Sequence, residues 1–392
     1  MFGSGSSQVR VLLASVLKPV DDTRMRGKFA ETLRERPNVQ VHIAGRAAAN
    51  VQPPSPAAAK GQVGQHPIFQ GSRLSLGRLV AQWRYWQLLQ KLRPALVIVH
   101  APELLPLTLL WQRLGTGRKF IYDIRENYAL NVRTQRVYGG LARRVLAGGL
   151  RWVETLAAQN GSAIILAEAS YADELPYLRP QPAGRVLVLE NKYQPTPNES
   201  FAPHSLPAPG QPLRLLYSGT ISELNGVWDA IALARQLRPA WPGGVQLTII
   251  GFCQQPDLLR RLQEAVAQHA DWLKLTGGAD MVPHAKIVAE IGLSDIGLLP
   301  YRPHTSTERC RPTKLFEYLA HGLPILASPN PRWQALIRQH GAGLPVDFAQ
   351  PLDGPALVAE LRRNNFYPNG IPADALWASE GKKLWLLLDS LV

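Results

Sequence analysis

Residues 311–328 bring together the residue types that can bind a diphosphate. Pro312 and Thr313 predict the start of a short helix, and the free backbone N–H groups at such a start favour an anion such as a pyrophosphate. Lys314 adds a full positive charge at the same end. The carboxylate of Glu317, one turn further along, is placed to accept two hydrogen bonds from a ribose diol. The segment therefore predicts a binding site for a nucleoside diphosphate.

Ordinary structural roles also account for these residues when each is taken alone. Lys314 is equally typical of a solvated lysine on a surface helix, and Glu317 is spaced to form an i, i+3 ion pair with it. Gly219, at the end of an expected strand, suits either the close approach of a phosphate or an ordinary tight turn. We favour nucleotide binding because Lys314 and Glu317 occur beside Pro312 and Thr313 in one helix start.

An alternation of short apolar strands with helical segments positions these residues, and it is typical of parallel sheets with helices on both faces. In the first half we expect strands at 9–16, 39–44, 96–100, 119–122, 163–167 and 185–189, and helices that end near 36 and span 76–92 and 104–114. In the second half we expect strands at 213–218, 245–251, 273–276, 296–300 and 324–328, with a helix at 227–237. The sequence thus predicts an α/β protein with two doubly wound, Rossmann-like halves.

The domain organisation follows from where this alternation stops and restarts. We expect an N-terminal domain at 1–193, a Pro/Ser/Asn-rich linker at 194–212, a C-terminal domain at 213–370, and a helix within 371–392 that packs back across the domains. Ligands bind beyond the carboxyl ends of strands in such sheets, so two halves facing each other predict one cleft between them. The Pro/Ala/Gly/Gln-rich residues 52–66 predict a mobile loop.

Composition sets the broad class and the kind of partner. At 392 residues the chain is long enough for two domains, and 46% hydrophobic with 18% charged residues is typical of a soluble globular protein. The net charge of +14 favours anionic partners: nucleotides, anionic lipid head groups or nucleic acid. Cys253 and Cys310 form no spacing motif, which favours a reducing compartment. The sequence contains no run of about 18 apolar residues, and no apolar signal segment precedes the first strand. We therefore expect a cytoplasmic protein.

Four motifs of the second half resemble, in order and spacing, the nucleotide-binding domain of glycosyltransferases with the two-domain GT-B fold, and the family-4 retaining enzymes in particular. These motifs are 217–226, 247–251, 295–301 and 312–328. In the first half, 97–103 and 122–128 resemble that family's acceptor-side strand ends. The resemblance implies transfer of a hexose, with retention, from a nucleotide-diphosphate sugar on the second domain to an acceptor hydroxyl of a cell-surface or lipid-linked glycan.

The resemblance also implies which residues hold the donor. Glu317 matches the second glutamate of the family's E-x7-E motif, which holds the ribose, whereas Arg309 occupies the place of the first glutamate and Glu308 lies one residue away. Thr220 and Asn225 stand where many members carry an arginine and a lysine. Lys314 is then the implied stabiliser of the leaving diphosphate. The implied donor-binding residues are Gly219, Thr220, Arg309, Arg311, Thr313, Lys314, Leu315 and Glu317.

His100 and Glu103 follow an expected buried strand, where an imidazole or a carboxylate is placed to contact an acceptor hydroxyl or the transferred sugar. The alternative is a histidine that is satisfied locally and caps the next helix. Pro102 and Arg125 replace two histidines that members of the family often carry. We expect catalysis to depend on Lys314, His100 and Glu103.

Charged residues also follow the neighbouring strands. Asp123, Arg125 and Glu126 suit either an acceptor site or a local salt-bridge network. The first loop, 18–24, is charged as well, and it suits either acceptor binding or plain solvation. The candidate acceptor-side residues are Arg24, Asp123, Arg125 and Glu126.

Two segments combine arginines with aromatic and aliphatic side chains. The segment 133–152 contains Arg133, Arg136, Arg143, Arg144, Arg151 and Trp152, and the segment 78–86 contains Arg78, Trp83, Arg84, Tyr85 and Trp86. Each suits either contact with an anionic membrane surface or a core helix with a solvated basic face. Together with the net charge, and because many related enzymes have lipid-linked acceptors, they predict peripheral contact with the inner face of the cell membrane.

Several other functions lack a sequence signal. No His/Cys cluster has metal-ligand spacing and no Asp-x-Asp loop is present, so we expect transfer without a metal or other cofactor. The chain has no G-x-G-x-x-G string, which disfavours a dehydrogenase, and no nucleic-acid-binding motif. Two rivals stay open: a nucleotide-sugar 2-epimerase of the same architecture, and a non-catalytic subunit that binds a nucleotide sugar. The departures at Pro102, Arg125 and Arg309 favour the second rival.

Overall fold

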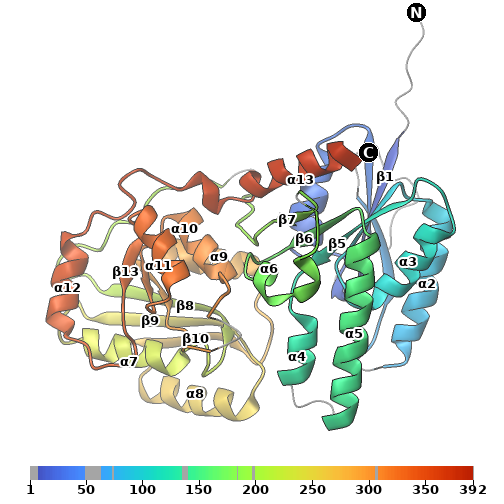
Figure 1. Cartoon of the computed structure of the whole chain (residues 1–392). Coiled ribbons are helices and arrows are strands. Elements are labelled where there is room, and N and C mark those ends of the chain that lie inside the picture. Colours follow the sequence, from blue (N-terminus) through green and yellow to red (C-terminus); the bar gives the residue numbers. More distant parts are fainter. Residues whose placement is uncertain are drawn as a thin grey trace, which may run out of the picture. The chain divides into compact units, whose positions relative to one another are not determined.

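The computed structural model describes residues 8–48, 63–72, 75–134, 140–182, 184–196, 199–304 and 308–391. The chain forms two compact units. Unit 1 comprises Met1–Gln194 together with Trp377–Val392, and unit 2 comprises Pro195–Leu376. Each unit has one parallel sheet flanked by helices, which confirms the predicted α/β class with two doubly wound halves (Figure 1).

Unit 1 is built on a seven-stranded sheet with the order β3-β2-β1-β4-β5-β6-β7. The strands are β1 (Val9–Pro19), β2 (Val39–Arg46), β3 (Gly64–Phe69), β4 (Leu96–Val99), β5 (Lys119–Ile124), β6 (Ala163–Leu166) and β7 (Val186–Val188). The helical segments are η1 (Met25–Ala30), α1 (Glu31–Arg34), α2 (Gly77–Leu92), η2 (Pro102–Leu104), α3 (Leu105–Arg113), α4 (Tyr128–Thr134), α5 (Gly140–Asn160), α6 (Tyr171–Glu174), η3 (Pro176–Leu178) and α13 (Ala378–Leu391).

Both faces of this sheet are covered, and β1 shows why. Its side chains point alternately to opposite faces. Leu12 and Ala14 pack in the core formed with α2, α3 and α5. Val11 and Leu13 pack in a second core with η1, α1 and α13. The uninterrupted apolar run of β1 is therefore the signature of a strand buried on both sides.

Unit 2 is built on a six-stranded sheet with the order β10-β9-β8-β11-β12-β13. The strands are β8 (Leu213–Ile221), β9 (Val245–Cys253), β10 (Leu273–Gly278), β11 (Ile296–Leu299), β12 (Ile325–Ala327) and β13 (Gly343–Pro345). The helical segments are α7 (Val227–Leu237), α8 (Pro256–Gln268), α9 (His284–Leu293), α10 (Thr313–His321), α11 (Pro331–Gln339), α12 (Gly354–Arg363) and η4 (Ala373–Ala375). The strand order reverses between β8 and β11, and this is where doubly wound sheets bind ligands.

The C-terminal segment divides between the two units. The helix predicted within 371–392 is divided into two helical segments, because η4 ends at Ala375 and α13 begins at Ala378. Trp377 marks the break: it is almost fully buried, its backbone N–H donates to the Tyr193 carbonyl at 2.6 Å, and its indole Nε1 donates to Thr32 Oγ1 at 2.8 Å. Helix α13 therefore packs within unit 1.

The sequence analysis missed two edge strands. Strand β3 begins inside the predicted loop at 52–66, and residues 52–62 of that loop lie outside the described part of the chain. With Gly64, Gln65, His66 and Pro67, β3 has little apolar content, which an edge strand tolerates. Strand β13 has three residues, too few for a periodic pattern. Both are found only because a neighbouring strand pairs with them.

Gly226 permits a close approach of α7 to the end of β11. Its φ of 76° lies in the left-handed region, and a Cβ on it would lie 1.8 Å from the Pro300 carbonyl oxygen. Gly244, in the same unit, has a φ of 74°, and a Cβ there would meet nothing within 4 Å. The two glycines thus share a backbone conformation and differ in their surroundings.

We expect Gly226→Ala to lower the free energy of unfolding of unit 2 more than Gly244→Ala does. Both substitutions carry the left-handed penalty of about 1–2 kcal/mol. Only Gly226→Ala also creates a backbone overlap, which adds about 1–3 kcal/mol. Urea unfolding of both variants measures the difference. Equal losses would contradict the close packing of α7 on the end of β11.

Candidate functional site

The start of α10 brings the predicted lysine against the carboxyl end of β8. The helix begins at Thr313, and its N-cap residue Pro312 has an extended conformation. A Cβ placed on Gly219, where φ is 98°, would lie 1.8 Å from Cε and 2.0 Å from Nζ of Lys314. The Lys314 side chain thus occupies the space that a side chain at residue 219 would need. Two residues that the sequence singled out separately meet at one place.

Burial governs the electrostatics of Lys314. It lowers the pKa of the ammonium group, and nearby Glu317 opposes this effect. A cation that has lost part of its hydration attracts an anion more strongly than the same cation in water. Because Lys314 lies in the first turn of α10, the helix dipole adds to that attraction.

Three glycines lie side by side at the carboxyl ends of β8, β9 and β10. Gly219 pairs with Gly251, and Gly251 pairs with Gly277. A Cβ on Gly251 would lie 1.7 Å from the Gly219 carbonyl oxygen, and one on Gly277 would lie 2.5 Å from the Gly251 carbonyl oxygen. We call these three residues the glycine row: the space of a Cβ is taken by Lys314 at Gly219 and by the carbonyl oxygen of the neighbouring strand at the other two, so the strand ends lie very close together. The sequence analysis selected Gly219 alone, although a glycine at the end of each successive strand was the signal for all three.

Glu317 is held between α9 and α10. Its carboxylate Oε1 lies 2.9 Å from Nε2 of His284, the first residue of α9. Its backbone carbonyl accepts a hydrogen bond from His321 Nδ1 at 2.7 Å. The side chain is 7% exposed, so the carboxylate is positioned before any ligand arrives. His284 was not predicted, and nothing in its spacing marks it.

The other predicted donor residues are more dispersed. The side chains of Thr220, Arg309 and Thr313 are exposed, and Arg311 is half-buried. Leu315 is fully buried. Its backbone N–H donates within the first turn at 2.9 Å, which leaves that group less available to a phosphate.

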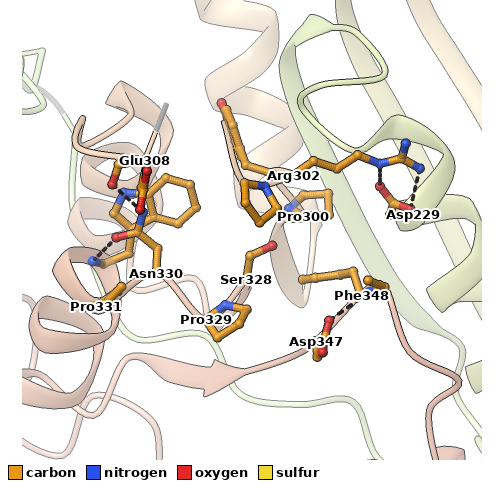
Figure 2. A pocket seen from close by; sticks show the side chains of 14 residues that line it. Asp229, Pro300, Arg302, Glu308, Ser328, Pro329, Asn330, Pro331, Asp347 and Phe348 are labelled. Carbon is orange, nitrogen blue, oxygen red and sulfur yellow. Dashed lines mark hydrogen bonds and ion pairs between the residues drawn. The ribbon is translucent and has the colours of Figure 1, made fainter. Parts of the chain in front are cut away.

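A cavity of about 770 Å³ lies elsewhere in unit 2, at the carboxyl ends of β11, β12 and β13 (Figure 2). The loops 300–303, 328–331 and 347–349 line it, together with Asp229, Glu308 and Trp333. Gly219, Lys314 and Glu317 are not among its lining residues. The sequence analysis did not predict this cavity, because its walls come from three loops that follow different strands.

Two of the four charged residues that line this cavity form an ion pair. Arg302 donates to both carboxylate oxygens of Asp229, at 2.7 and 3.0 Å, as the dashed lines in Figure 2 show. The side chain of Asn330 donates to the Glu308 backbone carbonyl at 2.8 Å. Arg302 is the only cation among the lining residues. Among the described residues that line the cavity, the one positive charge is therefore already paired.

In unit 1 two of the predicted acceptor-side residues, Arg24 and Asp123, form a buried triad with His100, which was predicted as a catalytic residue. Arg24 donates from Nε and Nη2 to the two oxygens of Asp123, at 2.9 and 2.7 Å, and His100 Nδ1 lies 2.6 Å from Asp123 Oδ2. Each of the three side chains is at most 1% exposed. Asp123 is the last residue but one of β5 and His100 directly follows β4, so adjacent strands of the sheet bring them together.

The protonation states of the triad follow from this geometry. Burial would raise the pKa of Asp123, but Arg24 and His100 outweigh it and hold that pKa well below its usual value. Burial lowers the pKa of His100, although Asp123 opposes it. His100 is then neutral, its Nδ1–H donates to Asp123, and Nε2 carries the lone pair. That Nε2 atom is buried without a hydrogen-bond partner. The local explanation for His100 thus accounts for one of its two nitrogens.

A second ion pair lies beside the triad. Arg125 donates to both oxygens of Asp22, at 2.8 and 3.2 Å. Burial would raise the pKa of Asp22, but Arg125 lowers it overall. The charged residues at the ends of β1 and β5 therefore form the salt-bridge network that the sequence analysis held open. The arginine that replaces a family histidine has a structural partner 103 residues earlier in the chain.

The two remaining predicted residues lie at the edge of this network. Glu126 is 3.6 Å from Lys18, and both side chains are substantially exposed. Glu103 pairs with Arg78 of α2 at 3.0 Å. Within the described residues, no group of histidine, cysteine or carboxylate side chains has the arrangement of a metal site. No described helix is long and apolar enough to span a membrane.

Comparison with known proteins places the fold. No protein-family model and no curated protein matches the sequence. Among solved structures, the chain is similar to sucrose-phosphate synthase from Thermosynechococcus elongatus, at 15% identity and a TM-score of 0.64 over 98% of this chain and 99% of that one. It is also similar to Anabaena HepE in complex with UDP and glucose, at 11% identity and a TM-score of 0.62 over 97% and 100% of the two chains.

A third similar structure is the catalytic domain of starch synthase IV from Arabidopsis thaliana bound to ADP and acarbose. The identity is 11% and the TM-score is 0.61, over 98% of this chain and 99% of that one. These proteins have the GT-B fold, and the coverage shows that the likeness extends over both units of the chain. The predicted fold is therefore confirmed.

The triad makes the stability of unit 1 dependent on pH. His100 and Asp123 both have a lowered pKa in the folded protein, so the unfolded chain binds more protons as the pH falls. The free energy of unfolding is therefore expected to fall as the pH drops below about 6.5, and to fall further below the ordinary pKa of aspartate. Urea unfolding between pH 7.5 and 5 measures the first part.

His100→Gln is the variant that isolates this contribution. His42 and His66 also have pKa values lowered by burial, and they titrate in both proteins. We expect the variant to lose stability less steeply than the wild type over the same interval. The same slope in both proteins would mean that His100 is not buried in its neutral form.

Proposed function

We propose that this protein is a glycosyltransferase that moves a hexose from a nucleotide-diphosphate sugar to an acceptor hydroxyl. The observation that carries the proposal is the contact between Lys314 at the start of α10 and Gly219 at the end of β8. It puts a half-buried cation and a helix start at the edge of the sheet where ligands bind. The names of two similar structures include a nucleoside diphosphate, UDP in one and ADP in the other.

The donor occupies unit 2 in this proposal. Its diphosphate lies against Lys314 and the first turn of α10, and the glycine row allows the nucleoside to lie flat on the backbone of β8, β9 and β10. Glu317 accepts hydrogen bonds from the ribose hydroxyls. Thr220, Arg309 and Arg311 complete the site from their loops. We favour this site over the cavity beside β12 because the only cation of that cavity is paired with Asp229.

The chemistry follows from charge development. The bond between the anomeric carbon and the diphosphate oxygen breaks, and its electron pair stays on the diphosphate. The acceptor oxygen bonds to the anomeric carbon and releases its proton to the departing diphosphate. Lys314 and the helix start oppose the negative charge that accumulates in this step, without requiring a metal ion. Retention of the anomeric configuration is part of the proposal through the resemblance to family-4 enzymes.

The acceptor contacts unit 1. Nε2 of His100 is a neutral nitrogen that has no hydrogen-bond partner within the described part of the chain, and Glu103 lies one turn beyond it. Arg24 and Asp123 act as positioning residues that fix the tautomer and orientation of the imidazole. Arg125 and Glu126 flank them. We infer that the acceptor is a growing cell-surface or lipid-linked glycan, and that the protein works in the cytoplasm at the inner face of the cell membrane.

Lys314→Ala is expected to abolish the stabilisation of the protein by its donor. A panel of UDP-, GDP-, ADP- and TDP-sugars in a thermal-shift assay identifies the donor, since a ligand at 100 times its Kd adds about 2.7 kcal/mol. Lys274→Ala, an exposed lysine near the start of β10, is the matched control and is expected to keep the shift. An unchanged thermal shift in Lys314→Ala would show that the diphosphate does not bind at the start of α10.

Glu317→Ala tests the ribose contact separately. Hydrogen bonds to a charged group contribute about 1.5–3 kcal/mol, so the variant is expected to bind the nucleoside diphosphate more weakly by that amount. The 2′,3′-dideoxy analogue lacks both hydroxyls and is expected to bind the variant and the wild type equally. Calorimetric titration of both ligands measures the four affinities. An equal loss for both ligands would show that Glu317 acts on the fold instead.

A further inference from the structure

Exposed apolar side chains are concentrated on one part of unit 1. Among the described residues, thirteen large hydrophobic side chains are exposed, and ten of them lie between residues 76 and 152. Of these ten, the most exposed are Leu76 at 82%, Leu141 at 77%, Leu79 at 69%, Val145 at 68% and Trp152 at 65%. Isolated exposed apolar residues are common on soluble proteins, but a concentration of this kind marks an interaction surface.

These side chains form a stripe on each of two helices. On α5, Leu141, Val145 and Trp152 recur at intervals of four and seven residues, which places them on one helical face. Leu76, at the N-cap of α2, and Val80 and Trp83 within that helix recur at intervals of four and three. The opposite faces of both helices pack in the core of unit 1. Each helix is therefore apolar on its inner and its outer side.

The two stripes belong to one layer of the fold. Helix α3 contacts α2 on one side and α5 on the other, and all three cover the same face of the sheet (Figure 1). Helices of a parallel sheet start at the carboxyl edge of the strands, so the beginnings of α2 and α5, which carry the stripes, point to the same edge. We call the exposed residues of these two stripes, with Arg84 and Arg144, the outer face of unit 1.

Charge on this layer is one-sided. Helices α2, α3 and α5 contain seven basic residues and one carboxylate, Glu154. Glu154 is buried and accepts a hydrogen bond from Tyr122 at 2.8 Å. Arg84 and Arg144 are exposed next to the apolar stripes. Of the sequence segment 133–152, Arg136 lies outside the described residues. The described parts of these helices thus expose leucine, valine, tryptophan and arginine but no carboxylate, which complements an anionic, partly apolar partner.

The outer face adjoins the proposed acceptor residues. Arg78 of α2 pairs with Glu103, and Gln82 donates from Nε2 to the Glu103 carbonyl at 3.0 Å. Glu103 follows His100 by three residues. A partner that binds the outer face therefore also sets the distance between that partner and His100.

We propose that the outer face of unit 1 binds the surface of an anionic lipid bilayer. Leucine, valine and tryptophan side chains enter the boundary between head groups and acyl chains, while Arg84 and Arg144 contact lipid phosphates. This inference rests on the proposed function, because a bilayer brings a lipid-linked acceptor to the side of unit 1 where His100 and Glu103 lie. It names the surface and the partner that the sequence left undefined.

Vesicle flotation tests the proposal with the full-length protein. We expect the protein to float with vesicles of phosphatidylcholine and phosphatidylglycerol, and to float much less with phosphatidylcholine alone. Raising the salt concentration to 0.5 M, an order-of-magnitude choice of about three times the physiological value, is expected to weaken binding because it screens the arginines. Equal flotation with both vesicle types would contradict the role of the arginines.

Paired variants locate the surface. Trp83→Ser with Trp152→Ser is expected to reduce partitioning by at least about tenfold, since each removes a large side chain from the interface. Leu386→Ser with Met281→Ser is the matched control, because these side chains are 71% and 76% exposed elsewhere in the chain. Equal partitioning of the two double variants would overturn the proposal.

Two further measurements separate this inference from the proposed function. The Trp83/Trp152 double variant is expected to keep the donor-induced thermal shift and transfer to a water-soluble acceptor, and to lose transfer to an acceptor embedded in vesicles. Loss of all three would show damage to the fold instead of to a docking surface, and it would refute the assignment. Sedimentation velocity tests whether the chain forms a dimer through this face. If the wild type is a dimer and the two substitutions dissociate it, the outer face serves self-association and the bilayer proposal is wrong.

Discussion

The proposed donor site depends on one contact, in which the side chain of Lys314 fills the space left open by Gly219. A residue with a Cβ at position 219 would meet both Cε and Nζ of that lysine. The glycine therefore does two things at once: it accepts a left-handed backbone conformation, and it lets a cation come down onto the end of β8. The next two strand ends are also held by glycines, Gly251 and Gly277, where a Cβ would overlap the carbonyl oxygen of the neighbouring strand.

At the corresponding edge of unit 1, the charged side chains are paired with one another. There, Arg24, Asp22, Asp123 and Arg125 cancel one another in two bidentate pairs. Buried pairs of this kind contribute little net stability, but removing one partner is costly, about 3–5 kcal/mol, because it leaves an uncompensated charge. The network is thus better suited to fixing geometry than to attracting a ligand. What it fixes is His100, whose Nε2 is left as the unsatisfied atom of an otherwise closed cluster.

The sequence indicated more of the fold than of the site, for physical reasons. Strands buried on both faces, such as β1, are apolar runs with turn signals at each end. Their positions along the chain could therefore be predicted from the sequence. Edge strands β3 and β13 have no such run and depend on a neighbour for their pairing. Helix α10 was placed correctly to the residue at its start because a proline and a glycine bracket it.

Contacts across the chain were beyond the reach of sequence patterns. Nothing in the spacing of His284 and Glu317, or of Asp22 and Arg125, reveals that they meet. The first pair joins helices α9 and α10, and the second joins the segments that follow β1 and β5; only the packing of the folded chain brings these segments together. The departures from the family pattern were visible, but their meaning was not: Arg125 proves to have its own carboxylate partner. The arginine that stands where the resembled enzymes often carry a histidine is thus part of a structural ion pair.

The net charge of +14 also becomes interpretable once the residues are placed. A basic protein that bound only a nucleotide would need its excess charge near the glycine row, yet seven basic residues lie on α2, α3 and α5 of unit 1 with a single buried carboxylate. Arginines spread over such a layer neutralise little of one small ligand, whereas they match an extended array of phosphates. Exposed tryptophan and leucine beside them are unfavourable in water and favourable at a lipid interface. The bilayer proposed for the outer face would therefore account for the seven basic residues of this layer, which the proposed donor site does not use.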